Sequence, residues 1–213
     1  IVGEEMERFG VHLWLAPALN IHRSIRCGRN FEYYSEDPLV SGKMAAAMTR
    51  GVQAHKGCGT TIKHYAANNK EYNRTRNNSM VSERAMREIY LKGFGICVRE
   101  SQPKAVMTSY NLLNGTHTAE HRGLIMDILR AEFGYEGIVM TDWVTAMAGD
   151  SRSANRDSQA QLVAAAGGDL FMPGNKGDYD NLLQGIDSGA VTLEQVKING
   201  SRVVKMARAM TQE

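Results

Sequence analysis

Polar side chains follow short apolar runs at four places in this sequence. In chain order the groups are Asn20, His22, Arg23 and Arg29; Lys63 and His64; Ser109, Tyr110 and Asn111; and Asp142 and Trp143. Because the carboxyl ends of parallel strands meet at one edge of a sheet or barrel, these side chains are expected to converge. Converging charged and hydrogen-bonding groups suit a sugar, whose hydroxyl groups need donors and acceptors from several directions.

Asp142 carries the most specific chemistry of these residues. It directly follows the apolar run 137–141 and precedes Trp143, whose ring can stack on the apolar face of a pyranose. A carboxylate fixed at that point can attack an anomeric carbon and form a glycosyl-enzyme intermediate. Aspartate is also a favoured helix N-cap, so its position alone fits a structural role equally well.

The neighbouring basic residues leave similar alternatives open. Lys63 and His64 can bind hydroxyl groups or form a structural hydrogen-bonding pair, and Arg29 alone could be an ordinary surface arginine. The six histidines have no HExxH or other metal-binding spacing, so neither a metal nor another cofactor is expected. The twelve methionines, including Met107 and Met140, are interpreted as core residues.

Strands and helices alternate along the chain and must position these groups. Strands are predicted over residues 11–16, 60–64, 105–109, 137–141 and 169–172, and helices over residues 39–55, 83–99, 124–133 and 192–210. Start signals precede three of the helices: Asp37 with Pro38, Ser82, and a capping box of Thr192 with Gln195. Continuously apolar strands that alternate with helices indicate an α/β fold with a buried parallel sheet.

The number of strands decides between two architectures. A (β/α)8 TIM-type barrel has eight strands and takes about 250 residues, whereas five strands are predicted here. Either the first strands of a barrel precede Ile1, or the chain forms an open doubly wound sheet. No linker or repeat divides residues 1–213, which are treated as one domain or part of one.

Composition excludes several classes of protein. The 213 residues are 43% hydrophobic and carry 25 basic and 23 acidic side chains, a balance unlike that of nucleic-acid-binding domains. No apolar run approaches the roughly 20 residues that span a bilayer. The residues after Ile1 do not resemble a signal peptide, and the cellular location stays open. Three cysteines without metal-binding spacing are expected to be free thiols.

Taken together, these segments closely resemble glycoside hydrolase family 3, in its β-glucosidase branch. The resemblance is carried by residues 15–23 (LAPALNIHR), 27–38 (CGRNFEYYSEDP), 62–71 (IKHYAANNKE), 82–91 (SERAMREIYL), 106–111 (VMTSYN), 137–143 (GIVMTDW) and 169–174 (DLFMPG). The matches occur in order along nearly the whole chain. The resemblance implies the barrel domain of that family, which occupies residues 1–213 and lacks its first strands.

Residue roles follow from the resemblance position by position. It implies that Asp142 is the catalytic nucleophile and that Arg29, Lys63 and His64 bind hydroxyl groups of the sugar in subsite −1. It places Tyr110 near the nucleophile. Two further substrate-binding positions are Trp143, at the entrance or as a sugar platform, and Met107 of the Met-Thr-Ser-Tyr motif. The positive charge of the basic residues is expected to keep Asp142 ionised.

Departures from the family pattern indicate what this chain does not supply. An Asp-Gly-Pro type motif near the barrel start, whose aspartate grips distal sugar hydroxyls, is missing. The acid/base glutamate of β-glucosidases comes from an α/β-sandwich domain, for which this chain has no candidate. The missing strands and that domain would come from the parent protein or a companion chain. The N-acetylglucosaminidase branch is disfavoured, because residues 66–69 read Ala-Ala-Asn-Asn instead of Pro-Gly-His-Gly.

The predicted function is that of a retaining β-glycosidase that removes terminal β-D-glucose from glucosides or oligosaccharides. A β-xylosidase, an exo-β-glucanase and a non-catalytic sugar-binding fragment are the alternatives, and the isolated chain could be inactive. A phosphate-binding barrel is disfavoured, because the sequence has no Gly-rich phosphate loop. Neither nucleic acid nor a membrane is expected as a partner.

Overall fold

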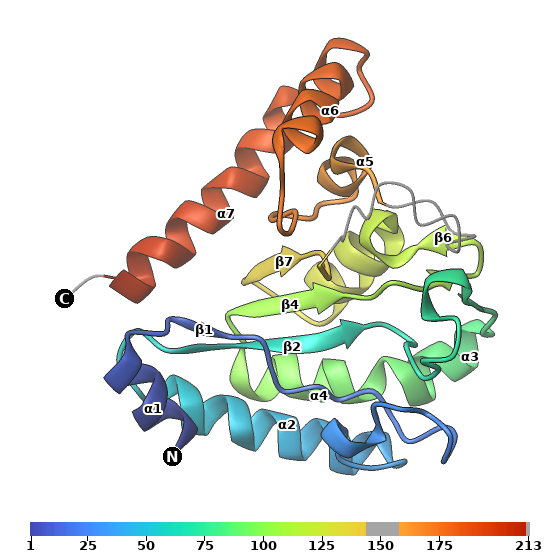
Figure 1. Ribbon diagram of the computed structural model, residues 1–213, viewed down its shortest axis with the longest axis vertical. Coiled ribbons are helices and arrows are strands. Elements are labelled where there is room, and N and C mark those ends of the chain that lie inside the picture. The colour runs from blue at the N-terminus through green and yellow to red at the C-terminus, as the bar shows by residue number, and fades with distance from the viewer. Residues whose placement is uncertain (144–157, 212–213) are drawn as a thin grey trace.

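A parallel sheet forms the centre of the computed structural model, which describes residues 1–143 and 158–211. Its strands, in spatial order, are β1 (Leu13–Trp14), β2 (Gly59–Tyr65), β4 (Ala105–Thr108) and β7 (Ile138–Met140), as Figure 1 shows. A parallel bridge between Met140 and Leu170 adds a fifth segment. The spatial order follows the chain order, as in a (β/α)8 barrel, whereas a doubly wound sheet reverses its order part-way. The predicted barrel-type architecture is confirmed, and the doubly wound alternative is wrong.

The sheet is open within the part of the chain that the structure describes. Its two edges are β1 and the bridged segment at Leu170. All five predicted strands therefore occur in the expected places, but four of them are shorter than expected, two of them greatly so. The run 11–16 forms only the two residues of β1, and the run 169–172 contributes the single bridge.

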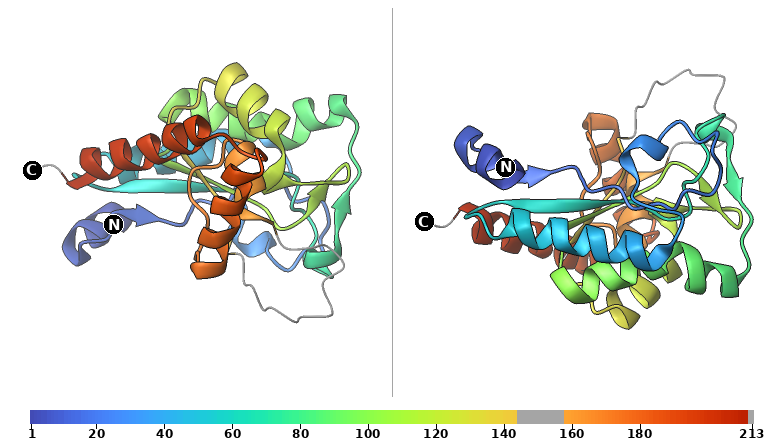
Figure 2. Two further views of the ribbon diagram at one scale, coloured as in Figure 1. Left: turned by 90° about the horizontal axis from the view of Figure 1, so that it is seen from above. Right: turned by 90° about the horizontal axis from the view of Figure 1, so that it is seen from below.

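Two apolar layers cover the two faces of the sheet. Because side chains alternate along a strand, Val106 and Val139 pack toward the helices, whereas Met107 and Met140 belong to a cluster on the other face. The helix layer consists of α2 (Pro38–Gln53), the π-helical segments η3 (Met86–Tyr90) and η5 (Gly123–Glu132), and α4 (Lys92–Ser101). Figure 2 shows α2, α4 and η5 on the same side of the strands. Burial on both faces explains why the strands read as continuous apolar runs.

Helices α2 and α4 approach each other at backbone distance. A Cβ atom on Gly42 would lie 2.9 Å from the Gly93 carbonyl oxygen and 2.9 Å from Ile96 Cβ, so a side chain there would clash. Helix α2 starts as predicted, because the Leu39 N–H donates to Asp37 Oδ1 at 2.7 Å. The close packing and the N-cap hold α2, the helix that precedes β2, in place.

Several elements differ from the sequence-based expectation. The predicted helix over 83–99 is divided into α3 (Glu83–Ala85), η3 and α4, because the π-helical turn interrupts the 3.6-residue period. Only half of the predicted capping box forms: the Gln195 N–H donates to Thr192 Oγ1, but the Gln195 side chain donates to Asn199. The sequence analysis did not predict α5 (Ala160–Ala165), α6 (Lys176–Asp187) or a small sheet of β3 (Asn78–Ser79), β5 (Leu112–Leu113) and β6 (Thr116–His117).

The remaining elements lie around this framework. They are α1 (Val2–Phe9), α7 (Leu193–Thr211), and the short 3-10 helices η1 (Asn30–Glu32), η2 (Arg74–Arg76) and η4 (Thr118–Glu120). None of the helices in the described ranges is long and apolar enough to cross a membrane. The three cysteines are buried free thiols, as predicted.

A buried ion cluster ties the last strands to α7. The Asp169 carboxylate is fully buried, and it accepts hydrogen bonds from Arg130 of η5 at 2.5 Å, Arg202 of α7 at 3.0 Å and the Val139 N–H of β7 at 2.7 Å. Helical segment η5, helix α7 and strand β7 are therefore joined through the Asp169 carboxylate. Removal of the carboxylate would leave two guanidinium groups without their anion in the protein interior.

We predict that Asp169→Ala lowers the free energy of unfolding by about 3–5 kcal/mol, the usual cost of removing one partner of a buried ion pair. Denaturant unfolding followed by circular dichroism measures the change. Asp180→Ala is the matched control, because the Asp180–Lys176 pair is exposed and should contribute less than about 1 kcal/mol. Equal losses for the two variants would contradict the assignment.

Candidate active site

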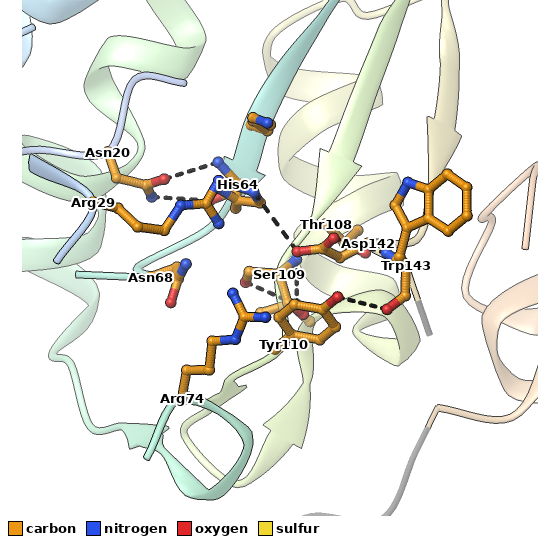
Figure 3. A network of polar contacts seen from close by, with 12 residues as sticks. Asn20, Arg29, His64, Asn68, Arg74, Thr108, Ser109, Tyr110, Asp142 and Trp143 are labelled. Carbon is orange, nitrogen blue, oxygen red and sulfur yellow. Dashed lines mark hydrogen bonds and ion pairs between the residues drawn. The ribbon is translucent and has the colours of Figure 1, made fainter. Parts of the chain in front are cut away.

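Asp142 lies at the end of β7 with its carboxylate buried. Its Oδ1 atom accepts a hydrogen bond from the Trp143 N–H at 2.7 Å. Its Oδ2 atom is buried and has no hydrogen-bond partner among the described residues. Such an oxygen is costly to leave unpaired in a fold, and it is available to a ligand. Figure 3 shows the carboxylate facing the end of β2.

His64 approaches Asp142 from β2, which is separated from β7 by β4. Its Nε2 atom lies 3.6 Å from Asp142 Oδ2, longer than a hydrogen bond. Asn20 holds the main chain of His64 with two hydrogen bonds: Asn20 Oδ1 accepts from the His64 N–H at 2.8 Å, and Asn20 Nδ2 donates to the His64 carbonyl at 2.9 Å. Asn20, from the segment that follows β1, therefore sets the position of His64 (Figure 3).

Arg29 and Lys63 share one carboxylate. The Arg29 Nε–H donates to Glu32 Oε1, and Lys63 Nζ lies 3.9 Å from Glu32 Oε2. Glu32 belongs to the Gly-Arg-Asn-Phe-Glu motif, but the sequence analysis assigned it no role. The 3-10 turn η1 brings Glu32 back to Arg29, because the Glu32 N–H donates to the Arg29 carbonyl at 3.1 Å.

Arg74 is a further site residue that sequence reasoning did not find. Its guanidinium carbon lies 4.8 Å from the centre of the Tyr110 ring, and its charge acts on Asp142. Arg74 Nη1 contacts Glu71 Oε2 at 3.4 Å. The residue lies three positions after the family-like segment 62–71, in a stretch without strand or helix periodicity. No pattern in the sequence pointed to it, and only the excursion between β2 and β3 brings it to the site.

Tyr110 and Trp143 lie beside Asp142. The Tyr110 hydroxyl donates to the Trp143 carbonyl at 2.5 Å, which joins the ends of β4 and β7. The Trp143 side chain is about half exposed, so its ring is accessible to a ligand. In Figure 3, Arg29, Asn68 and Arg74 lie on one side, with Asp142, Tyr110 and Trp143 on the other.

The other polar residues at the strand ends serve the framework. His22 Nε2 lies 3.0 Å from the Asn30 carbonyl, and Arg23 donates to the Tyr90 hydroxyl at 3.1 Å. The Ser109 N–H donates to Thr118 Oγ1, and Asn111 donates to the Ala66 carbonyl.

Met107 is buried in the apolar cluster that includes Ala105, Ile138 and Met140. This position agrees with the interpretation of the methionines as core residues. A contact between Met107 and substrate stays a prediction.

Burial governs the charge state of Asp142. Desolvation raises the pKa of the Asp142 carboxyl above its ordinary value. The Trp143 N–H, Arg29, Arg74 and Lys63 act in the opposite direction and stabilise the carboxylate. The cations therefore lower the pKa of Asp142, but burial raises it by more.

His64 does not contribute the positive charge that the sequence analysis expected. Burial lowers the pKa of His64 well below its ordinary value, and the neighbouring Arg29, Lys63 and Arg74 lower it further. The imidazole is neutral at pH 7, so His64 can act as a hydrogen-bond donor or acceptor there. Burial also lowers the pKa of Lys63, while Glu32 and Asp142 raise it.

The assembled groups can hold a polyhydroxylated ligand against a carboxylate. Cations, a neutral imidazole, a phenol and an exposed indole come from the ends of four adjacent strands and the loops that follow them. No group of three His, Cys, Asp or Glu side chains suited to a metal ion occurs in the described part of the chain. This combination of donors, acceptors and an aromatic ring suits a carbohydrate ligand.

Comparison with known proteins assigns the family. Residues 1–206 match the model of the glycosyl hydrolase family 3 N-terminal domain. The chain belongs to glycosyl hydrolase family 3. Among structures, β-glucosidase 3B from Thermotoga neapolitana in complex with glucose superimposes with a TM-score of 0.88 at 40% identity. The match covers 97% of this chain and 28% of that one.

Two curated relatives in the family bear different names. β-Glucosidase A from Butyrivibrio fibrisolvens is 54% identical over 141 residues, which are 66% of this chain and 17% of the relative. Exo-α-(1→6)-L-arabinopyranosidase from Bifidobacterium breve is 42% identical over 195 residues, which are 92% of this chain and 24% of the relative. The chain thus spans about a quarter or less of the length of these relatives.

We predict that Arg74→Met raises the pKa of Asp142, because a positive charge that stabilises the carboxylate is removed. The pH titration of the Asp142 carboxyl carbon, followed by NMR in selectively labelled protein, measures the shift. Arg84→Met is the control, since Arg84 lies in an exposed ion pair with Glu88. An unchanged or lowered pKa in the Arg74 variant would show that Arg74 does not act on Asp142.

Proposed function

We propose that this chain is the nucleophile-bearing part of a retaining β-glycosidase that releases terminal β-D-glucose. The observation that carries the proposal is the Asp142 carboxylate, whose buried Oδ2 atom has no partner among the described residues. Arg29, Lys63 and Arg74 act on that carboxylate with positive charge. The similarity to enzymes named β-glucosidase, one of them with glucose bound, supports glucose as the sugar.

The proposed reaction is a double displacement. Asp142 Oδ2 attacks the anomeric carbon and forms an ester bond to the sugar, while the bond to the leaving-group oxygen breaks. A carboxylic acid outside this chain, about 5 to 5.5 Å from the Asp142 carboxylate, donates its proton to that oxygen. Water, deprotonated by the same group, then attacks the anomeric carbon and releases Asp142. Two inversions give net retention.

The other residues of the site hold the glycone. Lys63 and Arg29 donate to sugar hydroxyl groups. The neutral His64 donates to another hydroxyl group, and Asn20 fixes its position through two hydrogen bonds to its main chain. Trp143 offers its exposed ring to the sugar or to the leaving group. Hydrogen bonds that strengthen as the ring flattens lower the barrier to attack. Because the chain spans only part of its relatives, we assign the acid to the remainder of a larger protein.

A trapping experiment tests the nucleophile without the acid. The reagent 2,4-dinitrophenyl 2-deoxy-2-fluoro-β-D-glucoside has a leaving group that departs without protonation, and its fluorine slows hydrolysis of the ester. We expect the wild-type protein to gain the mass of one fluoroglucosyl group, located on Asp142 by peptide mapping. Asp142→Asn should remain unlabelled, and Asp127→Asn, a carboxylate of η5 outside the site, should label normally. Labelling of another residue would overturn the assignment.

Steady-state hydrolysis supplies the complementary prediction. In the larger protein that supplies the acid, Asp142→Asn should lower kcat for 4-nitrophenyl β-D-glucoside by about 10⁴-fold or more, because the residue forms the covalent intermediate. The circular dichroism spectrum should stay unchanged. Wild-type protein that binds glucose without hydrolysing glucosides or reacting with the fluoroglucoside would instead favour a sugar-binding role.

Arabinopyranosides are a second candidate class of substrate, which one of the comparisons supports. The 42% identity to an exo-α-(1→6)-L-arabinopyranosidase favours 4-nitrophenyl α-L-arabinopyranoside as a competing substrate. The two glycosides, together with the β-D-xyloside, should be compared by kcat/KM. A higher value for the arabinopyranoside would replace glucose as the proposed sugar and leave the role of Asp142 unchanged.

A further inference from the structure

Glu32 is placed to act on two residues of the proposed sugar pocket at once. Its Oε1 atom accepts the Arg29 Nε–H, and its Oε2 atom lies 3.9 Å from Lys63 Nζ. The three side chains are mostly buried, with exposed fractions of 18% for Arg29, 16% for Lys63 and 22% for Glu32. Ion pairs in such surroundings are screened far less than exposed pairs.

Contact with Glu32 leaves donors of both cations free. Arg29 uses its Nε–H for Glu32, so the two terminal nitrogens of the guanidinium remain for another acceptor. Lys63 has three ammonium hydrogens, and a single carboxylate oxygen at 3.9 Å does not occupy them all. One carboxylate therefore restrains two flexible side chains without consuming their capacity to bind hydroxyl groups.

A comparison within the same site shows that this arrangement is specific to Glu32. Glu71 contacts Arg74 Nη1 at 3.4 Å and accepts a hydrogen bond from Asn68. Its charge also acts on Arg29, but among the described residues it forms an ion pair with Arg74 alone of the cations that act on Asp142. Arg74 is also more exposed than Arg29, with 42% of its side chain accessible. Glu32 therefore restrains two cations where Glu71 restrains one, and the Arg29 side chain that it contacts is more buried than that of Arg74.

We propose that Glu32 is a positioning residue that holds Arg29 and Lys63 together as one hydroxyl-binding pair beside Asp142. The inference rests on the proposed function for the identity of the ligand, but the contacts themselves do not depend on it. Glu32 makes no contact with the Asp142 carboxylate and acts on the sugar through the two cations. Its negative charge offsets part of theirs and raises the pKa of Lys63, which burial and Arg29 lower and which Asp142 also raises.

Two measurements on Glu32→Gln test this role. An NMR titration of the Lys63 side chain should show a lower pKa in the variant, because the anion that stabilises the ammonium form is gone. Hydrolysis of 4-nitrophenyl β-D-glucoside should lose about tenfold or more in kcat/KM, because even a small misplacement of substrate-positioning residues slows the reaction. Glu88→Gln, from an exposed ion pair, is the matched control and should change neither quantity.

Two additional variants separate positioning from charge and from folding. In an Arg29→Gln background, Glu32→Gln should cost less than in the wild type, because part of its effect passes through Arg29. Glu32→Asp keeps the charge but is one methylene shorter, so it should also lose kcat/KM. Multiplicative losses in the double variant, or full activity of Glu32→Asp, would overturn the proposal.

Failure of the proposed function can be recognised separately. If the wild-type protein neither hydrolyses glycosides nor binds glucose, the proposed function fails, while the titration of Lys63 still decides whether Glu32 holds the pair. An unchanged Lys63 pKa in a folded Glu32→Gln variant overturns the positioning role, whatever the activity of the wild-type protein.

Discussion

Burial of the parallel sheet on both faces is the constraint on which the site depends. Val106 and Val139 face the helix layer, while Met107 and Met140 face the opposite apolar cluster. Strands that are apolar on both faces have no room for charge along their length, so polar side chains collect where the strands end. Since the strands are parallel and adjacent in chain order, those ends form one rim.

The cations that surround Asp142 at this rim are themselves paired with carboxylates farther from it. Arg29, Lys63 and Arg74 act on Asp142, and carboxylates hold them from the other side: Glu32 the first two, and Glu71 the third. The outer anions reduce the repulsion among the cations, which otherwise disfavours bringing three positive charges together. The neutral state of His64 serves the same end, because a fourth positive charge in that space would be costly.

Asp142 and Asp169 show two uses of a buried carboxylate. Asp169 is saturated by two arginines and a backbone N–H, so it joins elements and has little capacity left for a ligand. Asp142 has one hydrogen bond on Oδ1 and none on Oδ2 within the described residues. Its incomplete pairing is costly for the fold and leaves an acceptor available for chemistry. The difference lies in the partners of the two carboxylates: Asp142 follows β7, whereas Asp169 directly precedes the bridged residue Leu170.

The sequence by itself determined where the strands lie along the chain, the helix starts at Asp37 and Ser82, and the expected convergence of Asp142 with Lys63 and His64, because apolar runs and capping residues are local signals. The spatial order of the strands, which distinguishes a barrel from a doubly wound sheet, came from the tertiary structure. Only the tertiary structure decided that Arg74 joins the site, that Glu32 contacts both Arg29 and Lys63, and that His64 is neutral. It also decided where π-helical turns divide the predicted helix over 83–99. The physical reason is that ion pairing and desolvation depend on distances between segments far apart in the chain, which neither periodicity nor spacing encodes.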